Sequence, residues 1–169
     1  MRRYFVGAAA GLLIAAGAGF LVLLSGRLPV AASSAPPGWE SRLARRIVDA
    51  SVERQAPRRA NPIAPTDAEL LTGLKLYRNN CAGCHGDGNA ASAWGAQFYP
   101  PVPQFGSRPP GKPDWQIHWI VENGLRYSGM GGWKGQMPEA DVWRVAAFLS
   151  RLDELPPSVA AAWKPPAAR

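Results

Sequence analysis

Cysteine and histidine are scarce in this chain of 169 residues, which has two of each. Both cysteines lie in the segment 81–85, which reads Cys-Ala-Gly-Cys-His, so a framework of several disulfides is excluded. A structural zinc site takes four ligands, and the sequence offers only His118 beyond this segment. No stretch alternates between apolar and polar residues over the length of a strand, and no stretch repeats. The sequence therefore predicts an all-α fold without disulfides.

The segment 81–85 has the C-x-x-C-H pattern that attaches c-type haem covalently. In that chemistry two thiols, here Cys81 and Cys84, add to the two vinyl groups of the haem, and the adjacent His85 supplies an imidazole to one face of the iron. The alternative is a redox or zinc Cys-x-x-Cys motif followed by a chance histidine, but no βαβ pattern surrounds the segment. We expect one covalent haem c.

Acidic residues are absent from residues 1–37, which carry three arginines. Within this part, residues 4–24 form an uncharged run of 21 residues, which is long enough to span a bilayer as a helix. Arg2 and Arg3 should stay on the cytoplasmic side, so that the rest of the chain lies outside, where bacteria attach c-type haem. A signal peptide cleaved near the small residues 30–32 is the alternative. We favour an uncleaved anchor over residues 1–26, because the run exceeds the usual signal-peptide core.

The formal net charge of +7 lies mostly outside the expected haem domain. Residues 38–65 have six arginines and three acidic residues, whereas residues 66–169 have ten basic and nine acidic residues. An exported haem protein does not meet nucleic acid, so we expect no nucleic-acid partner. The arginines are expected to face anionic lipid headgroups or an acidic protein.

Helix and proline signals divide the remaining chain into three parts. Residues 27–65 are expected to be a linker, with a basic amphipathic helix over 39–55 and a stiff Pro/Arg-rich segment after it. Residues 66–155 are expected to form the haem domain, and residues 156–169 a Pro/Ala-rich C-terminal tail.

Three helices are predicted within residues 66–155. Thr66 and Glu69 form a capping box that begins the first helix, which runs into Cys81. The second helix is expected over about 114–123 and the last over about 138–152, with long Gly/Pro-rich loops over 86–112 and 125–136.

This order of helix, C-x-x-C-H, Pro-rich loop, helix, Gly-Met loop and terminal helix resembles the monohaem class I cytochromes c over about residues 66–152. With its N-terminal anchor, the chain is similar to membrane-anchored bacterial members. The resemblance implies a small fold of three or more helices around one covalent haem, preceded here by a transmembrane helix. It implies a non-enzymatic electron carrier, single-pass in the inner membrane and facing the periplasm. Its partners would be a redox donor, a redox acceptor and, through the N-terminal helix, membrane lipid.

The resemblance further implies that His85 is the proximal iron ligand and a methionine the distal one. Met130 lies in a Ser-Gly-Met-Gly-Gly-Trp segment that matches the Gly-Met-Pro-Ala-aromatic loop of the family, except that Gly131 replaces the proline. Met137 does precede a proline, but it stands directly before the terminal helix, where it can pack as a hydrophobic staple. We favour Met130 over Met137. His118, expected to be half-buried beside tryptophans, is the third candidate.

Other site residues follow from the needs of the haem and its ligands. The second N–H of His85 needs an acceptor, and the loop of the family implies the Pro103 carbonyl, with Pro100 and Pro101 as alternatives. The propionates need buried donors, for which three side chains flank Met130: Arg126, Tyr127 and Trp133. Trp94 and Trp143 are expected to pack in the core.

Two further functions stay open. The chain can be an obligate haem subunit of a larger membrane oxidoreductase, with the helix 39–55 as docking surface. If the distal ligand is labile, the haem can instead serve an enzyme or a gas sensor.

Overall fold

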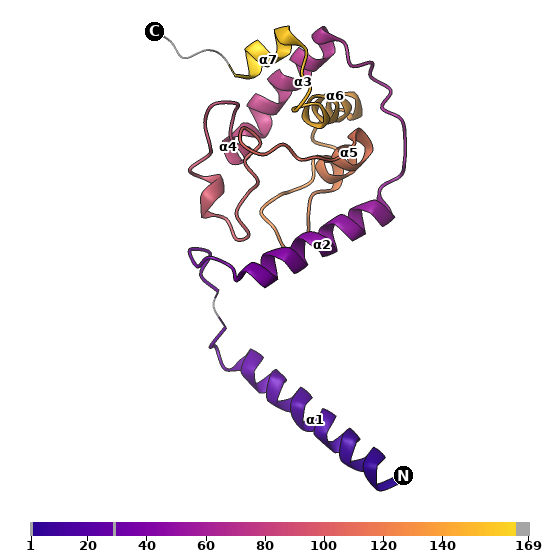
Figure 1. The fold of residues 1–169 in the computed structure, drawn as a ribbon, viewed down its shortest axis with the longest axis vertical. Coiled ribbons are helices and arrows are strands. Elements are labelled where there is room, and N and C mark those ends of the chain that lie inside the picture. Colours follow the sequence, from indigo (N-terminus) through magenta and orange to yellow (C-terminus); the bar gives the residue numbers. More distant parts are fainter. Residues whose placement is uncertain (1, 29, 165–169) are drawn as a thin grey trace. The chain divides into compact units, whose positions relative to one another are not determined.

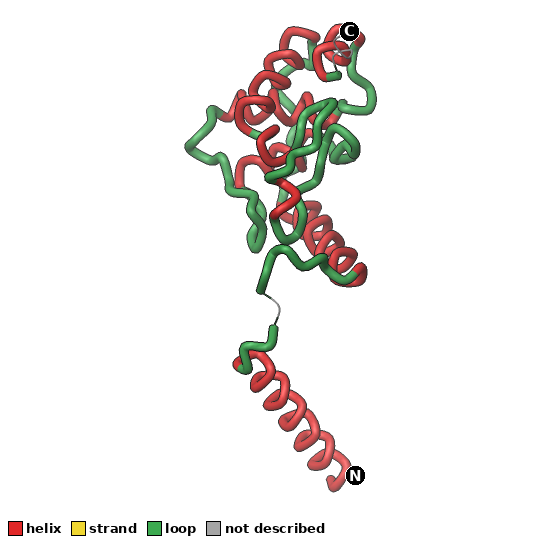
Figure 2. The backbone as a smooth tube through the Cα atoms, turned by 90° about the vertical axis from the view of Figure 1, so that its left-hand side faces the viewer, coloured by secondary structure: helices red, strands yellow, loops and turns green. Residues whose placement is uncertain are grey.

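Helices are the only regular elements in residues 2–28 and 30–164, which are the residues that the computed structural model describes (Figures 1 and 2). The expected all-α fold is confirmed. Chain contacts divide the protein into two compact units, residues 1–34 and residues 35–169. Each unit is described by itself.

The first unit is essentially one apolar helix, α1 (Arg2–Leu24). Its residues Arg3–Leu24 have a mean hydropathy of 2.2 in the most apolar window. A helix of this length extends about 33 Å, which matches the roughly 30 Å hydrocarbon core of a bilayer. By length and composition α1 can cross a membrane. A signal sequence near an N-terminus has the same properties.

The core of the second unit is the crossing of α3 (Asp67–Asn80) with α6 (Glu139–Ser150), and α5 (Asp114–Asn123) packs on the other side of α6. The two backbones of α3 and α6 touch at Gly73, because a Cβ there would lie only 2.3 Å from the Arg144 carbonyl oxygen. Tyr77 and Phe148 are fully buried beside this crossing. A glycine is therefore required where the two helices meet.

The capping box at the start of α3 forms only in part. The Thr66 hydroxyl accepts a hydrogen bond from the Glu69 N–H at 3.3 Å, as expected of an N-cap. The Glu69 carboxylate accepts instead from the Arg144 guanidinium of α6, at 2.6 Å. It therefore joins the two crossing helices as well as marking the helix start.

The segment expected to be a C-terminal tail contains a further helix, α7 (Pro157–Trp163). Trp163 is 3% exposed, and its ring meets the rings of Tyr77 and Phe148 edge-on at 5.6 and 5.4 Å. A proline at the first helical position favours a helix start, and Val159 and Trp163 are one turn apart on the buried side. The tail prediction is therefore wrong up to Trp163, and residues 165–169 lie outside the described residues.

The basic helix, α2 (Gly38–Gln55), also belongs to the second unit rather than to a linker. It contacts α5, and Val52 and Ala56 at its C-terminal end are buried (Figure 1). The apolar residues at helical spacing on which the prediction of this amphipathic helix rested, Trp39, Leu43, Ile47 and Ala50, are exposed. The side of α2 that packs is thus not the side that the periodicity predicted.

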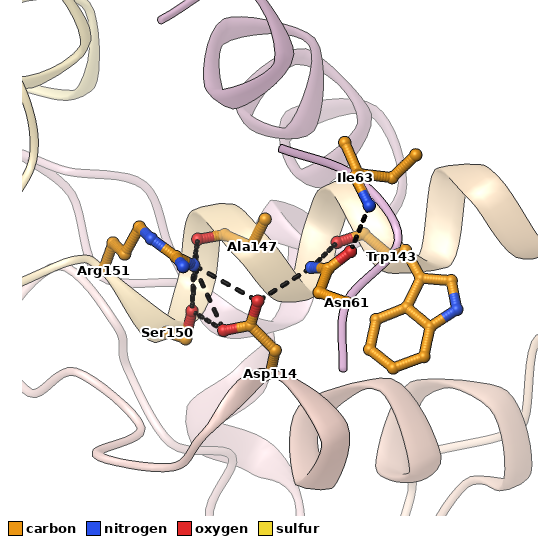
Figure 3. Close-up of polar contacts among 7 residues, drawn as sticks. All are labelled: Asn61, Ile63, Asp114, Trp143, Ala147, Ser150 and Arg151. Carbon is orange, nitrogen blue, oxygen red and sulfur yellow. Dashed lines mark hydrogen bonds and ion pairs between the residues drawn. The ribbon is translucent and has the colours of Figure 1, made fainter. Parts of the chain in front are cut away.

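The Pro/Arg-rich connection from α2 to α3 is fixed by Asn61 (Figure 3). The Asn61 amide donates to the Asp114 carboxylate at 2.8 Å and to the Trp143 carbonyl at 3.2 Å, and its oxygen accepts from the Ile63 N–H at 2.9 Å. Asp114 also accepts from Arg151 at 3.1 Å. These contacts hold the connection against α5 and α6, so the segment is part of the domain.

Candidate functional site

The segment 81–85 continues the line of α3 as a short helix, α4 (Ala82–His85). Cys81 stands at the junction, where its N–H donates to the Tyr77 carbonyl at 2.7 Å and its carbonyl accepts from the His85 N–H at 2.9 Å. Gly86 ends the turn with φ of 75°, a value that favours glycine. The two thiols and the imidazole are thereby carried on one helical turn.

The last carbonyl groups of a helix have no partner within it, and here residues 83–86 obtain theirs from outside α4. The Gly83 carbonyl accepts from Ser92 Oγ at 2.5 Å, and the Cys84 carbonyl accepts from Gln104 Nε2 at 3.0 Å. The His85 carbonyl accepts from the Phe105 N–H at 3.0 Å, and the Gly86 carbonyl accepts from the Tyr77 hydroxyl at 2.5 Å. Three of these donors come from the long loop after the motif. The loop is therefore structural, and it fixes the orientation of the turn.

Ser92 and Gln104 are site residues that sequence reasoning missed. Gln104 also accepts from the Ser92 N–H at 2.7 Å, so the two residues bind each other as well as the motif. Beside them, Gly95 in the 3-10 helix η1 (Gly95–Gln97) approaches the motif so closely that a Cβ would lie 2.0 Å from the Cys84 carbonyl oxygen. Polar residues in a Gly/Pro-rich loop are the only signal that the sequence gives for these contacts.

His85 is held in one orientation by Pro103 and Phe105. Its Nδ1 lies 3.0 Å from the Pro103 carbonyl oxygen, the partner implied by the family resemblance. Its ring stacks on Phe105 with centroids 4.6 Å apart and planes inclined by 6°. Because a carbonyl can only accept, the proton lies on Nδ1, and Nε2 keeps a lone pair for a metal.

Electrostatics favour the neutral form of the imidazole. Burial lowers the pKa of His85, although its hydrogen bond to the Pro103 carbonyl acts in the opposite direction. A neutral ring at neutral pH is the form that coordinates iron.

The cysteines do not have the character of a redox or zinc pair. Both thiols are free and half-buried. Burial, reinforced by electrostatic repulsion from Cys84, raises the pKa of Cys81 to about 12. Reactive and metal-binding thiols have a lowered pKa instead. No group of three or more His, Cys, Asp or Glu side chains that could hold a metal ion occurs in residues 2–28 and 30–164. Two half-buried cysteines on one helical turn with an oriented, neutral imidazole fit a covalent haem.

Met130 lies in the loop between α5 and α6, where the backbone on both sides of it is fixed. The Ser128 hydroxyl accepts from the Met130 N–H at 3.2 Å, and the Met130 carbonyl accepts from the Leu125 N–H at 3.0 Å. Met137 precedes Pro138, the N-cap of α6, and its N–H donates to the Trp133 carbonyl at 3.1 Å. Both methionines are half-buried against the same core, so burial does not separate them.

The three residues expected to serve the propionates have different surroundings. Tyr127 is 92% exposed with φ of 60°, and Arg126 is also exposed, whereas Trp133 is half-buried against the core. Only Trp133 has the sheltered position that a propionate donor needs. Trp94, expected in the core, is 59% exposed and meets Phe98 edge-on, whereas Trp143 is buried as expected.

His118 is 2% exposed, not half-buried as the sequence suggested. Its ring stacks on Trp143 at 3.9 Å, and it lines a pocket together with Pro57 and Arg59 of the α2–α3 connection. Its Nε2 is buried and has no hydrogen-bond partner in the part of the chain that the structure describes. This ring is part of the α5–α6 packing.

Comparison with known families gives one match. Residues 68–149 match the family model described as cytochrome c oxidase, cbb3-type, subunit III. A search of curated proteins finds no relative. The matched range starts in α3, contains Cys81, Cys84, His85 and Met130, and ends in α6. It therefore covers the helices that build the site and leaves out α1, α2 and α7.

Proposed function

We propose that this chain is a membrane-anchored electron-transfer protein whose haem domain faces the periplasm. Its residues 68–149 form a monohaem class I cytochrome c domain with one covalently bound haem c. The observation that carries the proposal is the geometry of His85. Its Nδ1 is bound to Pro103 at 3.0 Å, and its Nε2 is left free beside two thiols on the same helical turn. A ligand fixed in this way keeps its orientation while the iron changes charge.

When bound, the haem supplies an iron that alternates between the ferric and ferrous states. Cys81 and Cys84 would hold the macrocycle covalently, and His85 would fill the proximal position. Met130 would fill the distal position, and sulfur ligation there raises the reduction potential. With His85 and Met130 both bound to the iron, no position would stay open for a substrate. Gly83 lies exposed between the cysteines, which supports an electron path to partners at this edge.

The distal assignment rests on the position of Met130 in the chain. It has a glycine on each side, Gly129 and Gly131, which permit close backbone approach, whereas Met137 stands at a helix start before Pro138. A residue before proline is restricted to extended backbone. Met137 therefore has less freedom to approach the haem face opposite His85.

The anchor is proposed from α1, whose length and apolar composition suit a membrane span. Retention of the protein in membranes through washes with high salt and carbonate is the expected result. N-terminal sequencing that begins near Ser33 would instead show that the segment is a cleaved signal peptide.

The experiment for the electron-transfer site is a pair of matched substitutions in the purified holoprotein. Met130→Ala should abolish the near-infrared methionine–iron band of the oxidised form, lower the reduction potential and permit carbon monoxide binding to the reduced form. Met137→Ala should leave all three properties unchanged. The reverse pattern would assign the ligand to Met137. A wild-type protein that binds carbon monoxide readily would instead support an enzyme or gas sensor.

A second function has support from the matched family, which is described as a subunit of an oxidase. The chain would then transfer electrons as the haem subunit of a larger membrane oxidoreductase. Purification in mild detergent discriminates the two. A free carrier elutes alone, whereas a subunit elutes with partner proteins in fixed ratio.

A further inference from the structure

Helix α2 has two opposite apolar sides. Val52, 1% exposed, packs against the domain, whereas Trp39, Leu43 and Ile47 are 62, 51 and 57% exposed. At 3.6 residues per turn, Leu43 and Val52 are about 180° apart around the helix axis. Single exposed apolar residues are common on protein surfaces. Three large ones spaced at i, i+4 and i+8 instead form a continuous stripe over two helical turns.

The acidic residues of α2 are used in contacts with the haem domain. Glu40 accepts from the Tyr99 hydroxyl at 2.6 Å, Asp49 from Lys112 Nζ at 2.5 Å, and Glu53 from Gln116 Nε2 at 2.6 Å. The contacts extend over the whole length of α2. They fix the rotation of the helix on the domain, with the apolar stripe turned outward.

The basic residues of α2 are left for the surface. Arg42, Arg45, Arg46 and Arg54 form no ion pair with any residue in 2–28 and 30–164. By helical spacing, Arg54 continues the line of the stripe beyond Ile47, and Arg46 lies at the edge of the stripe that Trp39 marks. Because the three acids are held in contacts with the domain, Arg46 and Arg54 are the charges that accompany the apolar stripe on the outward side of α2.

We propose that this outward side of α2, formed by Trp39, Leu43, Ile47, Arg46 and Arg54, lies in the headgroup region of an anionic bilayer. A stripe of Trp and Leu flanked by arginine is the composition of helices that lie in a membrane interface. Arginines near an anionic surface strengthen such binding through their charge. The proposal rests on the membrane anchoring proposed above, and it adds a second membrane contact that orients the haem domain.

Chain length favours a lipid surface over a protein partner as the occupant. Residues 25–37 connect α1 to α2, and at about 3.5 Å per residue they reach no further than about 45 Å. If α1 spans a membrane, its surface is always within reach of α2. A protein partner, whether soluble or in the membrane, would first have to meet the chain by diffusion.

The test uses the full-length holoprotein in lipid vesicles, with a nitroxide spin label at Leu43→Cys. The haem consumes both native thiols, so the new cysteine is the only one available for labelling. Lys75→Cys is the matched control, because Lys75 is exposed and belongs to α3, a helix that lies away from α2 (Figure 1). The vesicles are phosphatidylcholine with or without phosphatidylglycerol. The measured quantities are label accessibility to oxygen and to a water-soluble nickel complex.

With phosphatidylglycerol present, the Leu43 label should become several-fold less accessible to nickel and more accessible to oxygen, while the Lys75 label stays accessible to nickel. The double substitution Arg46→Glu and Arg54→Glu should restore the accessibility of the Leu43 label to the nickel complex.

Three results would overturn the proposal. A Leu43 label that stays accessible to nickel in chains that float with the vesicles would exclude membrane contact. Dipolar broadening between labels would show a second copy of the chain on this side instead. Equal protection without phosphatidylglycerol would exclude the anionic surface as the ligand. Chains that fail to float at all would refute the anchor itself, an outcome distinct from the other three.

Discussion

Trp163→Ala is expected to destabilise the haem domain strongly, although Trp163 lies outside the range that matches the family. The ring is 3% exposed and contacts Tyr77 and Phe148, which are fully buried. Truncation removes about 150 Å² of buried apolar surface, worth about 4 kcal/mol at roughly 25 cal/mol per Å². The backbone of α7 is held by Arg78, which donates to the Trp163 carbonyl at 3.3 Å and to the preceding carbonyl at 2.8 Å. The cavity cannot easily collapse, so we expect a loss of about 3–5 kcal/mol in the free energy of unfolding.

The assay is guanidinium unfolding of the full-length holoprotein in detergent, followed by circular dichroism and haem absorption. Trp94→Ala is the matched control, because the same truncation is made at a tryptophan that is 59% exposed. It should cost less than about 1 kcal/mol. If Trp163→Ala costs no more than Trp94→Ala, the packing of α7 described here is refuted.

Three further predictions concern the packing around α5 and α6. Gly73→Ala places a methyl group against the α6 backbone and should cost about 1–3 kcal/mol or more in unfolding free energy, whereas Lys75→Ala on the exposed side of α3 should be nearly neutral. Burial lowers the pKa of His118 in the folded protein, so the unfolded chain takes up the proton first as the pH falls, and the folded protein loses stability below about pH 6.5. His118→Phe should therefore make the melting temperature less dependent on pH in this range, as thermal unfolding at a series of pH values would measure. Equal slopes in both proteins would contradict this. Asn61→Ala leaves Asp114 with one donor fewer and should cost about 1–2 kcal/mol, with the α2–α3 connection becoming more sensitive to limited proteolysis. Unchanged cleavage would show that Asn61 does not hold the connection.

The parts of the site that the sequence predicted are those encoded by local pattern. The C-x-x-C-H segment needs only its own spacing, and the Thr66 N-cap needs only the three residues after it. The Pro103 contact with His85 follows from family resemblance, because the loop that carries it is itself a short pattern. In each case the interacting groups are close in sequence or lie in a recognisable motif.

The hydrogen bonds that orient the motif were not predictable in the same way. Ser92 and Gln104 lie in a loop without periodicity, and many polar residues of the chain have the same local surroundings. Their role depends on which carbonyl groups lack a partner at the end of α4, and that is known only once the loop has folded over the helix. Propensity and spacing contain no information about such pairs.

The errors for α2, α5 and α7 have a common physical cause. Hydrophobic periodicity shows that a helix has an apolar side, but it does not show whether that side packs against the domain core, against a second layer of helices or against a surface outside the protein. In α5 both sides are covered, so His118 is buried although it lies off the apolar stripe. In α7 a stripe of only two residues is enough, because Tyr77 and Phe148 already provide the aromatic surface that Trp163 completes. In α2 the larger stripe is the one left exposed, while the acids take the contacts with the domain. If α1 spans a membrane as proposed, the bilayer is the nearest surface that can cover the apolar side that the polar contacts of α2 leave outside the folded domain.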